Sequence, residues 1–521
     1  MRQLTSLDAQ FLAMETPRTY GHVGGLAVYD GKLDLRHDVC RLLKERLHLL
    51  PPFRWRLVEV PFGVDHPYWV EDPDFDLDFH VRESAVAPPG DDRQLAELVS
   101  RIFARPLDRS RPLWEVYLIH GLEGGRAAML TKVHHSVVDG VSGAEILSVL
   151  LDLSPEGRAL PPPKSEGSGE RPPNDLAMLG RGLLGLPRQP LRALRALPST
   201  APNLLDVPGL ARVPGMARFG RLASALRGLV GGPRTDPHVL EMQTAPVPRT
   251  RFNARISAHR RFSFGSISLA TVKALKNELG ITVNDVVVAL CASAVRDWLI
   301  ERDELPRDPL VSMIPVSVRG PDERGTFGNR VSMMIVPVPT DVPDPRERLL
   351  RAHEYLEGAK ARHRAIPANL LTDATSFIPP AVAALAARTT LDIMARLRPP
   401  LNLVISNVPG PREPLYCSGV PLQAHFPVSV IADGVGLNIT AMSYRDHIDF
   451  GIVADHDMVD DAWSLMRNVE NSLDELEEAV CGAKRRERIS TSTDGITARA
   501  GPSPGAASPR SRGAAGRAGG R

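Results

Sequence analysis

The stretch that decides the fold reads HHSVVDG and occupies residues 134–140. Before it, the strand-like runs 114–119 and 126–133 flank a glycine-rich turn, so both histidines follow directly on a strand. After it, Ser142 and Glu145 fit a capping box at the start of an apolar helix. We therefore predict a strand-to-helix connection that presents side chains on a rigid support.

The histidines are candidates for proton transfer. An imidazole titrates near pH 6.5, so His135 can take a proton from a hydroxyl and pass it to a thiolate leaving group. A thioester is already activated and needs no covalent intermediate, because holding both substrates together removes much of the entropic barrier. The chain also has no Gly-x-Ser-x-Gly elbow. We predict His135, His134 and Asp139 as catalytic residues.

Other interpretations of the motif stay open. A buried histidine is commonly a hydrogen-bonded core residue, and Asp139 could either orient the imidazole or anchor the loop that ends at Gly140. A metal site is not expected, because adjacent histidines on one strand point apart and no further His or Cys stands at a zinc spacing.

The regions around the motif divide the chain into four parts. Residues 1–153 alternate strand and helix patterns, and residues 251–480 repeat this organisation, so two α/β lobes are predicted. Residues 154–250 are rich in Pro, Leu and Arg and are interpreted as a crossover. Residues 481–521 hold few large apolar side chains and are expected to form a disordered basic tail.

Composition excludes several classes of protein. The 63 basic and 61 acidic side chains leave a net charge of +2, too small to hold a nucleic acid. The four cysteines lie far apart, which argues against a disulfide framework. No run of 18 apolar residues and no signal peptide is visible, so a cytoplasmic protein is expected.

Six motifs in a fixed order carry a family resemblance. Besides HHSVVDG they read LDAQFL at 7–12, PLWE at 112–115, VNDV at 283–286, PVSVR at 315–319 and SNVPGP at 406–411. With these motifs the chain resembles the bacterial wax ester synthase/acyl-CoA:diacylglycerol acyltransferases, especially the actinobacterial triacylglycerol synthases, over about residues 4–480. The double histidine alone is also similar to that of condensation domains and chloramphenicol acetyltransferase-like enzymes.

The resemblance implies a two-lobed, chloramphenicol acetyltransferase-like α/β fold with an active-site tunnel between the lobes. It implies transfer of a long acyl chain from acyl-CoA to diacylglycerol or a long-chain alcohol, with no cofactor, because acyl-CoA is a substrate. His135 matches the catalytic position. Asp139 is expected to pair with Arg319 of the other lobe, because a buried carboxylate is costly unless it is paired.

Further positions could shape the site or the substrate channel: Gly140, Pro112, Leu113, Trp114, Asn284, Asp285, Ser406 and Asn407. Each has a structural alternative. The tryptophan could be a core aromatic of the hairpin, the aspartate could cap the helix that begins after Thr282, and the serine and asparagine could only form a turn.

A water-insoluble acceptor suggests contact with the inner membrane or a lipid droplet. Residues 191–197 and 219–230 are cationic and apolar and resemble interfacial helices, although they could equally pack across the lobes. Two rival functions fit the motif less well. A condensation-like enzyme would need carrier domains, for which the chain has no room, and a non-catalytic lipid-surface protein would be expected to have lost His135.

Overall fold

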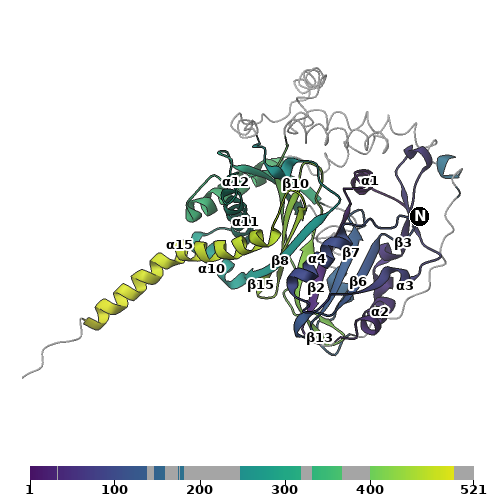
Figure 1. Ribbon diagram of the computed structural model, residues 1–521, viewed down its shortest axis with the longest axis horizontal. Helices are drawn as coiled ribbons and strands as arrows, with labels where there is room; N and C mark the ends of the chain where they lie inside the picture. The colour runs from purple at the N-terminus through teal and green to yellow at the C-terminus, as the bar shows by residue number, and fades with distance from the viewer. Residues whose placement is uncertain are drawn as a thin grey trace, which may run out of the picture.

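The computed structural model describes residues 1–31, 33–137, 146–158, 174, 177–180, 247–317, 331–365 and 399–497. These residues form two lobes, each built on a six-stranded sheet, and a small sheet of three strands (Figure 1). The small sheet has the order β1 (Arg2–Gln3), β4 (Tyr68–Glu71), β3 (Trp55–Val58). The expected two-lobed α/β architecture is confirmed.

The sheet of the first lobe carries the double histidine. Its order is β12 (Tyr416–Cys417), β13 (Val420–Val428), β2 (His22–Tyr29), β7 (Ala127–His134), β6 (Trp114–His120) and β5 (Val81–Ala85). All neighbours are antiparallel except β5 and β6. The predicted hairpin is thus confirmed as β6 and β7, and the second strand ends at the first histidine.

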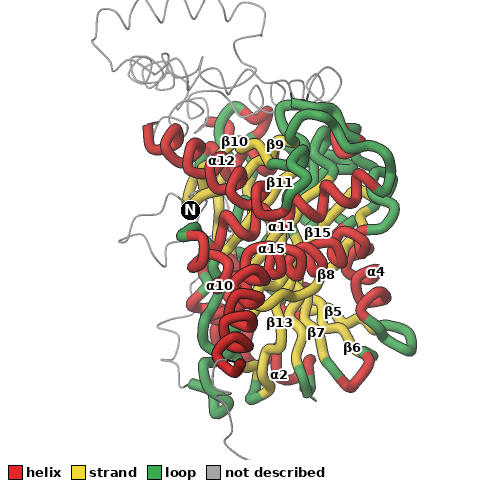
Figure 2. The backbone as a smooth tube through the Cα atoms, turned by 90° about the vertical axis from the view of Figure 1, so that its left-hand side faces the viewer, coloured by secondary structure: helices red, strands yellow, loops and turns green. Residues whose placement is uncertain are grey.

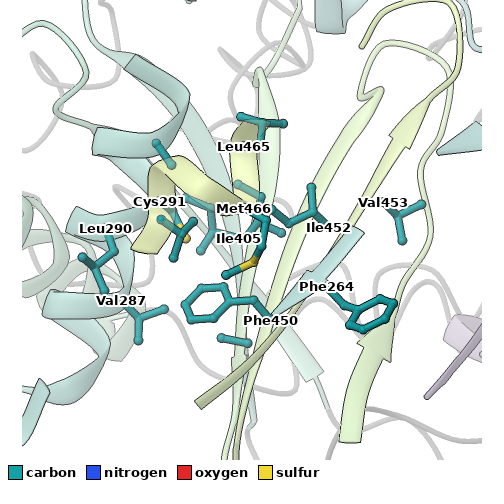
Figure 3. Packing of buried hydrophobic residues seen from close by; sticks show 14 of the residues in the cluster. Phe264, Val287, Leu290, Cys291, Ile405, Phe450, Ile452, Val453, Leu465 and Met466 are labelled. Carbon is teal, nitrogen blue, oxygen red and sulfur yellow. The ribbon is translucent and has the colours of Figure 1, made fainter. Parts of the chain in front are cut away.

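The sheet of the second lobe is packed against helices. Its order is β10 (Val331–Val338), β9 (Leu310–Ser317), β11 (Leu403–Val408), β14 (Leu437–Tyr444), β15 (His447–Asp455) and β8 (Arg260–Ser268). The helices are α10 (Leu269–Leu279), α11 (Val283–Ile300), α12 (Pro345–Ala365) and α15 (Ala462–Thr497) (Figure 2). Helix α11 is apolar on nearly all sides and is therefore buried. Figure 3 shows its Val287 and Leu290 in one cluster with Ile405 and Phe450 of the sheet.

The ends of α10 and α11 follow from local chemistry. The Ser268 hydroxyl accepts a hydrogen bond from Thr271 N, and Gly280 ends α10 in a left-handed conformation with φ of 68°. Thr282 and Asp285 form a reciprocal capping box at the start of α11. The capping alternative for Asp285 is confirmed.

The strand β13 corrects the predicted boundary between the lobes. Residues 251–480 were assigned to the second lobe, but β12 and β13 belong to the first-lobe sheet, where β13 pairs with β2. Pro421 and Pro427 lie within β13, and because proline is unusual in an interior strand the local sequence does not indicate this pairing. The chain therefore crosses back from the second lobe to complete the first.

This crossing is held by close backbone packing. A Cβ placed at Gly451 of β15 would lie 1.7 Å from the Pro427 carbonyl oxygen, so only glycine allows β13 to pass this close. The buried Asp449 accepts hydrogen bonds from His425 N at 2.8 Å and from Ser266 Oγ at 2.6 Å. One carboxylate thus connects β13, β15 and β8.

The helix α4 (Asp92–Phe103) contacts β8 of the second lobe and is also fixed to the strand that carries the motif. Lys132 of β7 is fully buried, and its Nζ donates to Arg105 O at 2.6 Å and Ile102 O at 3.2 Å. Burial lowers the pKa of Lys132 to about 8, against the opposing effect of Glu115. The ammonium therefore satisfies carbonyl groups at the C-terminal end of α4.

The end of the chain differs from the expectation. The disordered tail was placed at 481–521, but α15 continues to Thr497 and its end projects away from the lobes in Figure 1. That prediction weighed only apolar burial, whereas residues 484–488, all Lys, Arg or Glu, are good helix formers and continue a helix that packing has already nucleated. Residues 498–521, most of the crossover and the stretches 191–197 and 219–230 lie outside the described residues.

Among the described helices, none by itself has the length and hydropathy to span a membrane. Only α10 and α11 taken together pass that test, and they are bent by 108° at the break between them.

The packing at Gly451 gives a stability prediction. We expect Gly451→Ala to lower the thermal midpoint by about 1–3 °C, because the added methyl group meets the Pro427 carbonyl and overpacking costs about 1–3 kcal/mol. Scanning calorimetry measures the midpoint. Gly358→Ala on α12 is the matched control, since its nearest neighbour would be Arg362 Nη1 at 3.5 Å. Equal midpoints for the two variants would contradict the packing argument.

Candidate active site

A cavity of about 320 Å³ lies where the two sheets meet, and His135 forms part of its wall. Residues of β2, β6, β7 and β13 contribute to the lining from the first lobe, and residues of β9, β11 and β14 from the second. Most of the lining is aliphatic or aromatic. Such a cavity suits a hydrocarbon chain and excludes most water from the histidine.

His135 is the first residue after β7 and is half-buried. Its backbone N–H donates to Gly21 O at 2.7 Å, and its ring stacks on Phe11 with centroids 4.2 Å apart and planes 7° apart. The helix α1 (Ser6–Ala13) carries Phe11, so the imidazole is supported from the N-terminal segment.

His134 is not among the residues that line the cavity, and only 1% of it is exposed. Its Nδ1 lies 3.1 Å from Ser136 N and 2.7 Å from Ser136 Oγ. A backbone N–H can only donate, so Nδ1 accepts and the ring proton resides on Nε2. Nε2 lies 3.2 Å from Glu15 Oε1, within ion-pair distance although not in hydrogen-bond geometry.

Glu15 connects the two histidines to the N-terminal segment. Its Oε1 accepts a hydrogen bond from Gly21 N at 2.8 Å, and its Oε2 accepts from Arg109 Nη2 at 2.8 Å. Burial raises the pKa of Glu15, but His134, the Gly21 N–H and Arg109 outweigh it and lower the pKa to about 2. The carboxylate is therefore ionised at neutral pH. Gly21 bonds Glu15 through its N–H and His135 through its carbonyl.

The predicted PLW block supports the motif directly. Leu113 O accepts the hydrogen bond of His134 N at 2.9 Å, and Pro112 O accepts that of Trp114 N at 2.8 Å. The buried Trp114 lines the cavity, and its Nε1 donates to Phe53 O at 2.7 Å. Trp114 is thus both a core aromatic and part of the cavity wall, while Pro112 and Leu113 are not among the lining residues.

The two residues predicted on α11 lie outside the cavity lining. Asn284 Oδ1 accepts a hydrogen bond from Asn407 Nδ2 at 3.3 Å, so it reaches the site through that partner. Asp285 is fully buried, and His353 Nδ1 lies 2.8 Å from its Oδ2. Asp285 therefore caps α11 and connects it to α12.

Ser406 and Asn407, at the end of β11, both line the cavity on the second-lobe side. They lie in register with Thr440 and Ala441 of β14. The structure therefore brings Ser406, Asn407, Trp114 and His135 to one cavity. Asp139, Gly140 and Arg319 fall outside the described residues, as does the predicted ion pair between them.

The chain that follows the motif is anchored at the end of the helical turn 146–150. Arg46 donates to Asp152 Oδ1 at 2.7 Å and also to Leu150 O, and both ionic side chains are buried. Asp152 also exchanges two backbone hydrogen bonds with Tyr416, which lie at 2.9 and 2.8 Å. The chain after the motif is thus fixed to both α2 (Leu35–Arg46) and β12.

Several lining residues were missed by sequence reasoning: Phe11, Gly24, Gly25, Thr131, Ser429, Asn438, Thr440 and His425. Glu15 was missed as well. Phe11 belongs to the motif at 7–12, which was used only as part of the family resemblance. His425 lies on β13, which the local sequence did not indicate. In the described part of the chain, no group of three or more His, Cys, Asp or Glu side chains could hold a metal ion.

Family models match most of the chain. The wax ester synthase/diacylglycerol acyltransferase catalytic domain matches residues 4–287, and the C-terminal domain of the same family matches residues 327–477. The Mycobacterium tuberculosis H37Rv protein named "Probable diacyglycerol O-acyltransferase tgs2" is 35% identical over 484 residues. That match covers 91% of this chain and 98% of the relative.

Solved structures agree with this assignment. The wax ester synthase/diacylglycerol acyltransferase from Marinobacter aquaeolei VT8 is 30% identical, with a TM-score of 0.62 over 91% of this chain and 98% of that one. The first condensation domain of the calcium-dependent antibiotic synthetase is 19% identical, with a TM-score of 0.53 over 92% and 96% of the two chains, and shows the fold alone. The chain is an acyltransferase and belongs to the wax ester synthase/diacylglycerol acyltransferase family.

Proposed function

We propose that the protein transfers a long acyl chain from acyl-CoA to the hydroxyl of diacylglycerol or of a long-chain alcohol, with His135 as general base. The observation that carries this proposal is the place of His135, whose imidazole borders an otherwise largely apolar cavity shared by both lobes. The names of the family and of the relatives supply the two acceptor classes.

The chemistry needs only one proton carrier. His135 takes the proton of the acceptor hydroxyl as its oxygen attacks the thioester carbonyl, and a tetrahedral intermediate forms. Collapse of this intermediate breaks the carbon–sulfur bond, and the imidazolium returns the proton to the CoA thiolate. No acyl-enzyme and no cofactor is required, since acyl-CoA is a substrate. Ser406 and Asn407, on the opposite wall, are candidates to donate to the developing oxyanion.

His134 and Glu15 are positioning residues in this proposal. His134 is absent from the cavity lining, so its predicted catalytic role becomes one of holding the turn that presents His135. Glu15 stabilises that turn from the other side through Gly21. We further propose that Asp139 pairs with Arg319 and anchors the loop that ends at Gly140, because a buried carboxylate is costly unless it is paired.

Delivery of the acceptor implies a lipid surface. Diacylglycerol and long-chain alcohols are insoluble, so we infer that the enzyme works peripherally at the inner membrane or at a lipid droplet. The basic, apolar stretches 191–197 and 219–230 are candidates for that contact.

The base assignment is tested by His135→Ala. We expect ester formation from palmitoyl-CoA with hexadecanol or dipalmitoylglycerol to fall by a factor of about 10²–10⁴, the usual contribution of a positioned general base. Free CoA and ester are quantified together. His120→Ala, at the exposed end of β6, is the control and should retain activity. Wild-type rates for His135→Ala would exclude the base role, and the ratio of the two esters gives the acceptor preference.

The lowered pKa of Glu15 gives a pH-dependent prediction. A carboxyl whose pKa falls from 4.5 to about 2 on folding stabilises the protein above pH 4.5, and this contribution is lost as the pH falls towards 2. We expect Glu15→Gln to lower the free energy of unfolding by roughly 3 kcal/mol at pH 7, and by progressively less at lower pH.

Denaturant unfolding at pH 7, 4 and 3 measures this change. Glu59→Gln is the matched control, because Glu59 also contacts Arg109, at 3.2 Å, but is largely exposed. A loss of the same size at every pH would show that the Glu15 charge is not what stabilises the segment.

A further inference from the structure

A second histidine, His425 of β13, lines the same cavity as His135. Only 7% of His425 is exposed, and the mechanism proposed above gives it no part. Its backbone N–H is bonded to Asp449, so the residue is fixed in the sheet while its ring belongs to the cavity wall.

The His425 ring occupies space that is free only because residue 25 is glycine. A Cβ placed at Gly25 of β2 would lie 2.2 Å from both Cε1 and Nε2 of His425, and Gly25 is also part of the lining. A larger residue at position 25 would displace the imidazole. The edge of the ring that carries Nε2 therefore rests on bare backbone beside the cavity.

The His425 ring is polar, but its buried Nδ1 atom makes no hydrogen bond with the described residues. Burial lowers the pKa of His425 to about 4, so the ring is neutral at pH 7. An unpaired buried N–H is rarer in proteins than an unused acceptor, which places the proton on Nε2 rather than on Nδ1. The donor then lies at the ring edge beside Gly25, and both His425 and Gly25 line the cavity.

The distance from the reacting atoms fixes what this donor can meet. Gly25 lies opposite Thr131 in the β2–β7 register, and Thr131 precedes His135 by four residues. At about 3.3 Å per residue, the backbones of Thr131 and His135 are roughly 13 Å apart. An extended chain advances 3.8 Å in three bonds, so about ten bonds separate them. The lining includes the apolar Val116, Val133 and Leu147, together with the polar Thr131, Asn438 and Thr440.

We propose that His425 is a specificity-determining residue that donates a hydrogen bond to an oxygen carried in the middle of an aliphatic chain bound in this cavity. The substrate class is thus a mid-chain hydroxy or oxo chain, accepted in addition to the plain chain. The inference rests on the proposed function. A plain methylene at this point leaves the donor unpaired, whereas an oxygen satisfies it.

The chain could come from either substrate, so the test has two arms. In the first, octadecanoyl-CoA is compared with 12-hydroxyoctadecanoyl-CoA, and 2-hydroxyoctadecanoyl-CoA serves as a positional control, with hexadecanol as acceptor. In the second, palmitoyl-CoA is used with octadecanol or 1,12-octadecanediol. The kcat/KM ratio of each mid-chain oxygenated substrate to its plain counterpart is measured for wild type and for His425→Leu.

In one of the two arms we expect the kcat/KM ratio of the mid-chain oxygenated to the plain substrate to fall about tenfold in His425→Leu. The corresponding ratio for the 2-hydroxy substrate should stay the same. That arm identifies the bound chain. His425→Gln should restore part of the ratio through its amide donor. His120→Leu, at the exposed end of β6 and away from the cavity lining, is the matched control and should leave the ratio unchanged.

Unchanged ratios in both arms would overturn the proposal. A second readout is stability. Replacing an unpaired buried imidazole with leucine should leave the thermal midpoint equal or higher, and a clear decrease would show that the protein itself satisfies the ring. Failure of the proposed function is a separate result, since wild type would then form no ester from the plain substrates.

Discussion

Two consecutive histidines at the end of one strand cannot face the same way, and this alternation organises the site. His135 reaches the cavity only because His134 turns into the interior, where a polar ring needs partners. Ser136 accommodates one ring nitrogen, and the ionised Glu15 lies beside the other. The N-terminal segment is therefore part of the site, although it precedes the motif by more than a hundred residues.

The same segment supports the reactive ring from outside. Phe11 stacks on His135, and Gly21 bonds both Glu15 and the His135 backbone. Behind the strand, Lys132 attaches β7 to the C-terminal end of α4. The imidazole consequently stands on a strand that is held from three directions, which limits how far its ring can move when the substrates bind.

Structural features that depend only on residues close together in the sequence could be predicted. The hairpin of β6 and β7 and the cap at the start of the helix after Thr282 follow from short-range chemistry and are present. Ser406 and Asn407, to which the family motifs drew attention, line the cavity.

Long-range pairings were not predictable in this way. The strand β13 carries two prolines and lacks a clear alternation, so nothing local indicates that it pairs with β2, about 400 residues earlier. The role of Glu15 depends on that same folding back of the N-terminus, and His425 could be located only after β13 was placed. The end of α15 was missed for a different reason, since the good helix formers at 484–488 continue the helix beyond its apolar part.

The return of β13 to the first sheet has a consequence for protein engineering. Because residues 416–428 complete the sheet that begins at residue 22, the two halves are not modules that can be separated at the crossover. A chimera that joins the N-terminal half of one homologue to the C-terminal half of another would place a foreign strand beside β2. Recombination of acyl-chain preferences within this family should therefore transplant the β13 segment together with the N-terminal half.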